Sequence, residues 1–137
     1  MTTQQIQLVK HTWATLREVD PVLLGEVFFG SLFLKNPSLR RLFPPSMDAH
    51  YPKFIQMLSL LVMQLDRPAD MLPELEQMAR NHLDYGVKPA HYAPVGKALL
   101  WTLERGLGTD WNPDVQTAWE ACYERITDVM LNEWRRK

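Results

Sequence analysis

The spacing of the apolar residues is the feature that most constrains this chain. Along nearly the whole sequence these residues recur three and four positions apart, and an alternation of polar and apolar residues lasting five positions is hard to find. A repeat of three to four residues puts apolar side chains on one face of an α-helix, whereas a half-buried strand needs alternation. The pattern therefore predicts an all-α fold of about seven helices, with no internal repeat and no linker.

Prolines and capping residues predict where these helices begin and end. Asp20 and Asn112 each precede a proline, and a side-chain cap followed by proline is typical of a helix N-terminus. Gly86 lies just beyond another apolar repeat, where a glycine often ends a helix. The predicted helices cover residues 3–18, 20–35, 48–66, 71–84, 89–107 and 113 onward, with a short helical element between Asn36 and Phe43.

Size and composition narrow the class of protein. The chain has 137 residues, and because a domain has roughly 100–200 residues, it predicts a single domain over 1–137. Hydrophobic residues make up 46% and charged residues 23%, as in a folded globular protein. Fifteen Lys and Arg oppose 16 Asp and Glu, so there is no surplus of positive charge to bind nucleic acid.

The cysteine count and the apolar runs predict the compartment. Cys122 is the only cysteine in the sequence, which excludes an internal disulfide and a thiolate zinc cage and favours a reducing compartment. There is no apolar run of about 18 residues, and the first residues lack the order of a signal peptide. We therefore expect a cytoplasmic protein that has no membrane partner.

Common catalytic motifs are absent from the sequence. None of the four histidines has a glutamate three residues before it, which a di-iron bundle would need. The chain also contains no HExxH, GxGxxG, Walker-type or GxSxG motif. Self-contained enzyme classes built on these motifs are therefore excluded.

Two histidines occupy positions that predict a shared site. His82 follows Leu75 by seven residues and Met78 by four, which places it on the apolar face of its helix. His50 opens the apolar helix that continues through Phe54. The two imidazoles could therefore face one cavity from different helices, with a flat hydrophobic cofactor between them. For either histidine alone, a hydrogen-bonded structural role is the commoner one.

Three segments in the same order resemble a known family. They are VFFGSLFLKNPSLRRLF, which ends at Phe43, NHLDYGVKPAHYAPVGKALLWTLERGLG, which holds His82 and Tyr92, and AWEACYERITDVM. Together they resemble the globins, most closely the single-domain bacterial haemoglobins and the haem domain of flavohaemoglobins, with some likeness to neuroglobin. The resemblance covers nearly the whole chain and implies a globin fold around haem b (iron protoporphyrin IX).

The resemblance implies roles on the proximal side of the haem. It makes His82 the proximal iron ligand, Tyr92 the tyrosine that supports it, and Phe43 the phenylalanine that stacks on the haem. Flavohaemoglobins add a glutamate from the last helix, and that position falls near Arg136 here. Glu133, about one turn away, is the alternative, so a strongly electron-donating proximal side is not established by the sequence.

The resemblance also implies the distal residues. The 32-residue interval between His50 and His82 is the one that globins keep between the distal gate and the proximal ligand. His50 is therefore the distal candidate, and Tyr51 replaces it if one residue is inserted or lost between the helices. Phe54 is the apolar residue one turn further in, and Phe29 is the pocket residue of the second helix.

The resemblance implies reversible binding of dioxygen, and of nitric oxide and carbon monoxide, at the iron. Many bacterial relatives have a tyrosine where Phe29 stands, and since Phe29 cannot donate a hydrogen bond, we expect dioxygen to leave faster here. His50 has two options: it donates a hydrogen bond to the gas, or it coordinates the iron itself. The alternatives are a nitric oxide dioxygenase that depends on a separate reductase and a bis-histidyl globin in electron transfer.

Overall fold

The computed structural model describes residues 1–136, and within them all regular structure is helical. Lys137, the last residue of the predicted domain, lies outside the described residues. No helix in the described part of the chain is both long and apolar enough to cross a membrane. The α-helices are α1 (Thr3–Leu16), α2 (Pro21–Lys35), α3 (His50–Met63), α4 (Pro68–Asp84), α5 (Tyr92–Leu107) and α6 (Pro113–Arg136), and the 3-10 helices are η1 (Pro37–Leu42), η2 (Pro89–His91) and η3 (Gly108–Asp110).

The predicted all-α fold is confirmed, and the predicted caps are present. The carboxylate of Asp20 accepts a hydrogen bond from the backbone N–H of Val22 at 2.8 Å. The amide oxygen of Asn112 accepts one from the N–H of Val115 at 2.9 Å. Gly86 has a φ of +83°, a conformation that favours glycine, just after α4 ends. These local signals depend on a few neighbouring residues, which is why the sequence predicts them.

Some helix ends differ from the prediction by a few residues. Helix α4 begins at Pro68 and not at 71, because a proline in the first turn needs no hydrogen bond for its nitrogen. The segment predicted as one helix from 89 begins as the single-turn η2, and α5 starts only at Tyr92. Helix α3 covers His50–Met63 and is shorter than the predicted 48–66.

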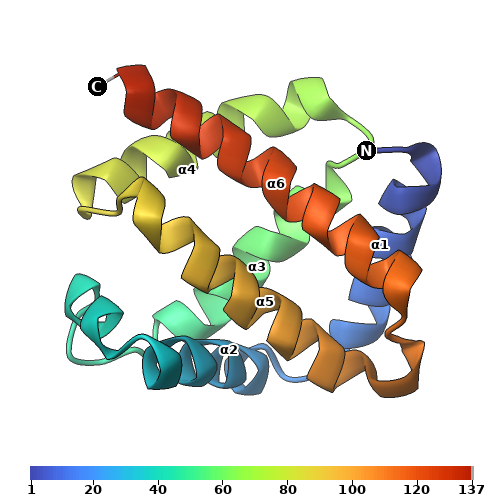
Figure 1. Cartoon of the computed structure of the whole chain (residues 1–137), viewed down its shortest axis with the longest axis horizontal. Coiled ribbons are helices and arrows are strands. Elements are labelled where there is room, and N and C mark those ends of the chain that lie inside the picture. The colour runs from blue at the N-terminus through green and yellow to red at the C-terminus, as the bar shows by residue number, and fades with distance from the viewer. Residues whose placement is uncertain (137) are drawn as a thin grey trace.

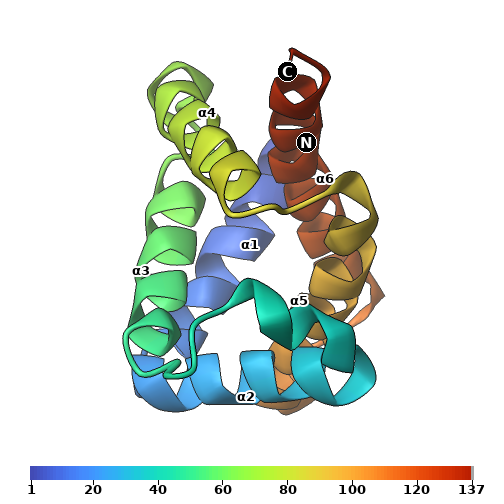
Figure 2. The same cartoon turned by 90° about the vertical axis from the view of Figure 1, so that its left-hand side faces the viewer.

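The helices surround the interior on several sides. Figure 2 shows α3 and α5 on opposite sides of the molecule, with α2 across one end and α4 across the other. Helix α2 packs against both α3 and α5, while α6 packs against α1 and α4. In Figure 1, α5 and α6 cross the front and α3 lies behind them. Helices α2 and α5, which are far apart in the sequence, thus face one common interior together with α3 and α4.

Two tryptophans join the helices α1 and α6 in the core. The rings of Trp13 and Trp119 meet edge to face with 5.9 Å between their centroids, and both side chains are buried. The indole N–H of Trp13 donates to Ser59 at 2.9 Å, and that of Trp119 donates to Thr12 at 3.0 Å. Both buried N–H donors have a partner, so neither adds the free-energy cost of an unpaired polar group to the core.

Helix α2 lies directly against the start of α3 at Gly25. A Cβ atom placed on Gly25 would lie 2.5 Å from the backbone oxygen of Tyr51 and 2.7 Å from its Cα. Real Cβ atoms do not come so close, so this crossing requires glycine. The contact fixes the first turn of α3, which contains His50, against α2.

Candidate functional site

His82 lies in the last turn of α4 and its imidazole is partly buried. Its Nδ1 lies 2.7 Å from the carbonyl oxygen of Met78, one helical turn earlier. A carbonyl oxygen can only accept, so Nδ1 carries the hydrogen and Nε2 holds a free electron pair. Burial lowers the pKa of His82, and the bond to Met78 opposes that shift only in part. The structure thus presents a neutral imidazole whose Nε2 can bind a metal.

Four of the predicted site residues come together where α2, α3 and the connection after η1 meet. The Phe29 side chain is 5% exposed, and its ring centroid lies 5.4 Å from that of Phe43 and 5.5 Å from that of Phe54. The Phe43 ring meets the imidazole of His50 edge to face at 5.6 Å. Phe29 also lies 6.0 Å from the ring of Tyr51, the alternative distal residue. The result is an aromatic wall that contains one imidazole.

His50 has a polar atom without a partner in this wall. Its Nδ1 is buried and makes no hydrogen bond within residues 1–136. Buried polar side-chain atoms nearly always have a partner, because an unpaired one costs roughly 1–3 kcal/mol. An imidazole in that condition is expected where a ligand supplies the missing interaction.

Arg40 holds the backbone that leads from η1 toward His50. Its guanidinium donates to the carbonyl oxygens of Pro44 and Pro45, each at 2.7 Å, and to that of Phe43 at 3.3 Å. Its carbon Cζ also lies 5.5 Å from the ring centre of Phe33. These bonds stiffen the connection between η1 and α3. The sequence analysis did not identify Arg40, since no local pattern marks an arginine that binds carbonyls.

Tyr92 begins α5 and is partly buried, and this burial raises the pKa of its phenol. Its carbonyl oxygen accepts a hydrogen bond from the hydroxyl of Tyr123 on α6 at 2.6 Å. The ring of His82 bonds to Met78, so support of His82 by Tyr92 stays a prediction. Tyr123 received no role from the sequence, although it lies in the third segment that resembles globins.

Glu133, the alternative to a proximal glutamate, is engaged elsewhere. The Glu133 residue is 8% exposed. Its carboxylate accepts a hydrogen bond from Arg136 at 3.0 Å. Arg136 also lies 3.6 Å from the carboxylate of Glu76 on α4. The carboxylate of Glu133 is therefore paired with Arg136 at the end of α6 and not with Tyr92.

Comparison with known proteins defines the class to which this arrangement belongs. A family model described as Globin matches residues 26–130, from within α2 to most of α6. The chain therefore belongs to the globin family, and it is a haem-binding globin. The matched range includes every residue of the aromatic wall as well as His82 and Tyr92.

The curated relatives are longer proteins. The chain is 31% identical over 134 residues to a flavohemoprotein of Bordetella parapertussis, covering 93% of this chain and 32% of the relative. It is 26% identical over 129 residues to a flavohemoprotein of Bacillus subtilis, covering 92% and 32%. The chain thus spans about a third of the length of these relatives.

Solved structures confirm the globin fold over nearly the whole chain. A bacterial globin from Campylobacter jejuni superposes with a TM-score of 0.82 at 23% identity, over 98% of this chain and 97% of that one. A hexacoordinated heme protein from an anhydrobiotic tardigrade superposes with a TM-score of 0.87 at 16% identity, over 98% and 96%. At these identities the match establishes the fold.

The residues present in this structure fit a haem. His82 offers a neutral imidazole whose ring orientation is fixed by Met78. Phe29, Phe43 and Phe54 offer apolar rings that suit the flat porphyrin, and His50 offers a buried nitrogen that lacks a partner. An apolar pocket with an imidazole ligand is the setting in which proteins hold haem iron.

Proposed function

We propose that this globin binds dioxygen reversibly at the iron of haem b, with His82 as proximal ligand and His50 as hydrogen-bond donor on the opposite face. The observation that carries the proposal is the buried, unpartnered nitrogen of His50 beside Phe43. When bound, ferrous haem supplies an iron that takes up and releases diatomic gases. The resemblance to single-domain bacterial haemoglobins supports the same role.

The proximal residues of the chain hold the cofactor. Nε2 of His82 would supply an electron pair to the iron, and the hydrogen bond from Nδ1 to Met78 keeps the ring in the tautomer and orientation that this requires. Tyr92, at the start of α5, would line the same side. Because Glu133 pairs with Arg136, the proximal imidazole would lack the extra carboxylate that makes it strongly electron-donating.

The distal residues control what the iron binds. The N–H of His50 would stabilise the partial negative charge of a bound gas, as charge-assisted hydrogen bonds do. The rings of Phe29, Phe43 and Phe54 would exclude water without offering a hydrogen bond. Since Phe29 cannot donate a hydrogen bond, we expect dioxygen to dissociate faster than from a globin that has a tyrosine at this position.

A second candidate is a bis-histidyl globin in electron transfer, in which His50 binds the iron when no gas is present. The same observation favours it, because coordination would equally satisfy the unpartnered nitrogen of His50. Nitric oxide dioxygenase activity with a separate reductase also follows from the resemblance, and the pairing of Glu133 with Arg136 adds no support for it. A cytoplasmic location, which the single cysteine favours, stays a prediction.

The visible spectrum of the ferrous, ligand-free protein separates the two candidates. One broad visible band is expected for five-coordinate iron and supports an open site, whereas two sharp bands indicate coordination by both His82 and His50. Oxygenation that reverses when the gas is removed is expected for the first candidate. Protein that stays colourless when haem is supplied would contradict both.

A further inference from the structure

The connection between η1 and α3 is an irregular segment of the aromatic wall. Residues 43–49 form neither helix nor strand. Pro44 and Pro45 lack a backbone N–H, so this segment cannot be held by a regular ladder of backbone hydrogen bonds. It nevertheless leads directly to His50, the first residue of α3 and the proposed distal residue. Whatever fixes this connection therefore fixes the approach of His50 to the site.

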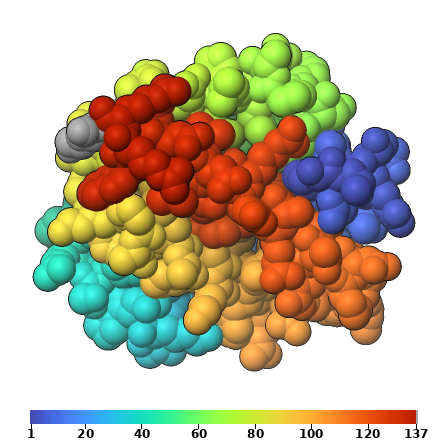
Figure 3. Space-filling model, turned by 45° about the horizontal axis from the view of Figure 1, so that its top comes forward, coloured from blue at the N-terminus to red at the C-terminus, as the bar shows by residue number. Residues whose placement is uncertain are grey.

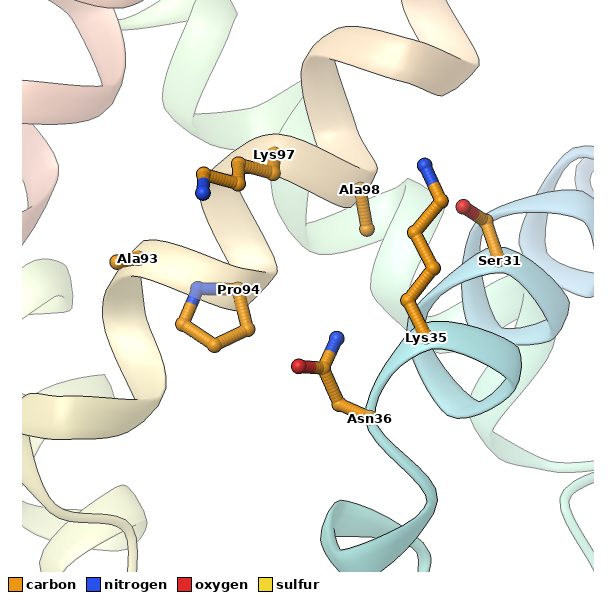
Figure 4. A pocket seen from close by; sticks show the side chains of 7 residues that line it. All are labelled: Ser31, Lys35, Asn36, Ala93, Pro94, Lys97 and Ala98. Carbon is orange, nitrogen blue, oxygen red and sulfur yellow. The ribbon is translucent and has the colours of Figure 1, made fainter.

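The elements on both sides of the connection are anchored. The side-chain amide of Asn36 donates to the carbonyl of Leu32 at 3.1 Å, and its own carbonyl accepts from the N–H of Leu39 in η1 at 3.0 Å. Figure 4 shows Asn36 at the end of α2, across from Pro94 of α5, and in Figure 3 the surfaces of α2 and α5 adjoin. At the other end, α3 packs on α2 at Gly25. The segment between these anchors depends on side chains for its position.

Arg40 is the side chain that holds this segment. Its Nη1 donates to the carbonyl oxygen of Pro44 at 2.7 Å and to that of Phe43 at 3.3 Å, and its Nη2 donates to that of Pro45 at 2.7 Å. A planar guanidinium presents its N–H groups in a fixed fork, so these bonds set the relative positions of the three carbonyls. Within residues 1–136, no other side chain donates to a carbonyl of this connection.

Two routes couple Arg40 to His50. The first runs through rings: Cζ of Arg40 lies 5.5 Å from the ring centre of Phe33, and the Phe33 and Phe43 centroids are 5.3 Å apart. The Phe43 ring in turn meets the imidazole of His50 at 5.6 Å. The second runs through the backbone, because the N–H of His50 donates at 2.8 Å to the carbonyl of Met47, whose side chain is buried. A displaced connection would therefore move both the ring beside His50 and the start of α3.

We propose that Arg40 is a positioning residue of the gas site, which holds the imidazole of His50 where it reaches the iron or a gas bound to it. The role rests on the proposed function, in which His50 occupies the distal face of the haem. Arg40 acts only through His50, since its own N–H groups are given to the backbone. Without these bonds the imidazole would spend less time in line with the gas, and a hydrogen bond weakens steeply when it is misaligned.

A double-mutant cycle between Arg40 and His50, read by dioxygen release from the haem-loaded protein, tests this role. His50→Leu removes the donor and should speed release at least about tenfold, through the loss of one charge-assisted hydrogen bond. Arg40→Ala should speed release severalfold, and should add nothing when His50→Leu is present, because the group that it positions is gone. Arg41→Ala removes the same charge from the exposed neighbouring residue and should release dioxygen as the parent does.

Hydrogen exchange in the haem-loaded protein gives a readout that does not depend on release rates. The N–H groups of His50 and Tyr51, which both bond to the carbonyl of Met47, should exchange faster in Arg40→Ala, while those of α6 exchange as in the parent. Arg40→Lys keeps the charge but has one nitrogen in place of the two that bond to the proline carbonyls. It should therefore restore slow exchange and slow release only in part.

The outcomes separate this role from the proposed function. If His50→Leu leaves dioxygen release unchanged, the distal assignment of His50 fails and the role of Arg40 fails with it. If His50→Leu acts as expected but Arg40→Ala releases dioxygen at the parent rate, or speeds release equally with and without His50, only the role of Arg40 is overturned. Unchanged exchange at His50 and Tyr51 in Arg40→Ala would overturn it as well.

Discussion

At the scale of single residues, the backbone decides what the imidazole of His82 can do. The carbonyl of Met78 accepts from Nδ1, so the nitrogen that points away from the helix is left with its electron pair. Burial lowers the pKa of this imidazole, which keeps it neutral and available to iron near neutral pH. One hydrogen bond and partial burial thus prepare the proposed iron ligand before any cofactor binds.

Replacement of His82, the proposed proximal ligand, should release the haem. For His82→Ala we expect haem to dissociate faster by more than the roughly 10–100-fold that follows when a metal ligand loses only its hydrogen-bond partner. Transfer of haem to a competing apoprotein measures the rate, and His11→Ala, at an exposed histidine, is the control. Unchanged haem loss and an unaltered Soret band in His82→Ala would contradict the assignment of this residue.

A donor added at position 29, in the same aromatic wall as His50, should hold dioxygen longer. In Phe29→Tyr the new hydroxyl lies in a buried setting, where it needs a partner and a bound gas can provide one. A charge-assisted hydrogen bond of about 1.5–3 kcal/mol corresponds to dissociation slowed at least about tenfold. Stopped-flow measurement of dioxygen release gives the rate. Phe33→Tyr, whose ring lies 5.8 Å from that of Phe29, is the matched control.

If Phe29→Tyr releases dioxygen at the parent rate, Phe29 does not line the gas site. If Phe33→Tyr slows release as much, the effect does not depend on position, and the distal assignment of Phe29 fails. Either outcome would mean that other residues of the aromatic wall line the gas site.

At the scale of elements, the crossing of α2 and α3 depends on one glycine. Gly25→Ala would put a Cβ against the backbone of Tyr51, which cannot move without shifting α3. We expect the free energy of unfolding to fall by about 1–3 kcal/mol, as for other overpacked contacts. Urea unfolding measures it.

Gly30 on the same helix provides the control. It is exposed, and a Cβ there would meet no atom within 4 Å. Gly30→Ala should therefore stabilise α2 by roughly 0.5–1 kcal/mol. Opposite signs for the two alanines would show that packing against α3 sets the requirement at Gly25, and equal effects would contradict it.

Elements that depend on neighbouring residues could be predicted from the sequence, and contacts across the fold could not. The caps at Asp20 and Asn112 follow from a side chain and an N–H two or three residues away. Arg40 acts through carbonyls whose positions depend on the path of the chain after η1. The hydrogen bond from Tyr123 to Tyr92 joins α6 to α5 across 31 residues, and no local repeat marks it.

The candidate site shows the same division. The apolar spacing around His82 and the opening position of His50 indicated two inward histidines from sequence. The spacing does not predict the tautomer of His82 or the unpartnered nitrogen of His50, because both depend on the path of the backbone in the folded protein. The pairing of Glu133 with Arg136, three residues later on α6, is by contrast a local contact that the sequence spacing could have predicted.

At the scale of the whole molecule, α6 brings ionisable groups into the core that the fold keeps neutral. Burial raises the pKa of the Cys122 thiol from its ordinary 9.0 to about 12. Burial also raises the pKa of the Tyr123 phenol, and the nearby Tyr92 adds to that shift. An unfolded chain would ionise these groups at lower pH, so folding and alkaline titration are coupled through the core.

The sign of this coupling predicts a loss of stability at high pH. Between pH 9 and 12 the unfolded state releases the Cys122 proton and the folded state keeps it, so the free energy of unfolding falls as pH rises and is unaffected by this group well below pH 9. At pH 10 the loss from Cys122 amounts to about 1 kcal/mol relative to pH 7. Urea unfolding at the two pH values measures it.

Cys122→Ala separates the contribution of the thiol to the pH dependence of stability from that of the tyrosines. The variant loses packing at every pH, because Cys122 is 1% exposed. Its stability should nevertheless fall between pH 7 and 10 by about 1 kcal/mol less than that of the parent. The remaining decline then belongs to Tyr123 and Tyr92, whose raised pKa values act at higher pH. Equal declines in parent and variant would mean that the thiol reaches water in the folded protein, and that α6 does not seal the core as its burial indicates.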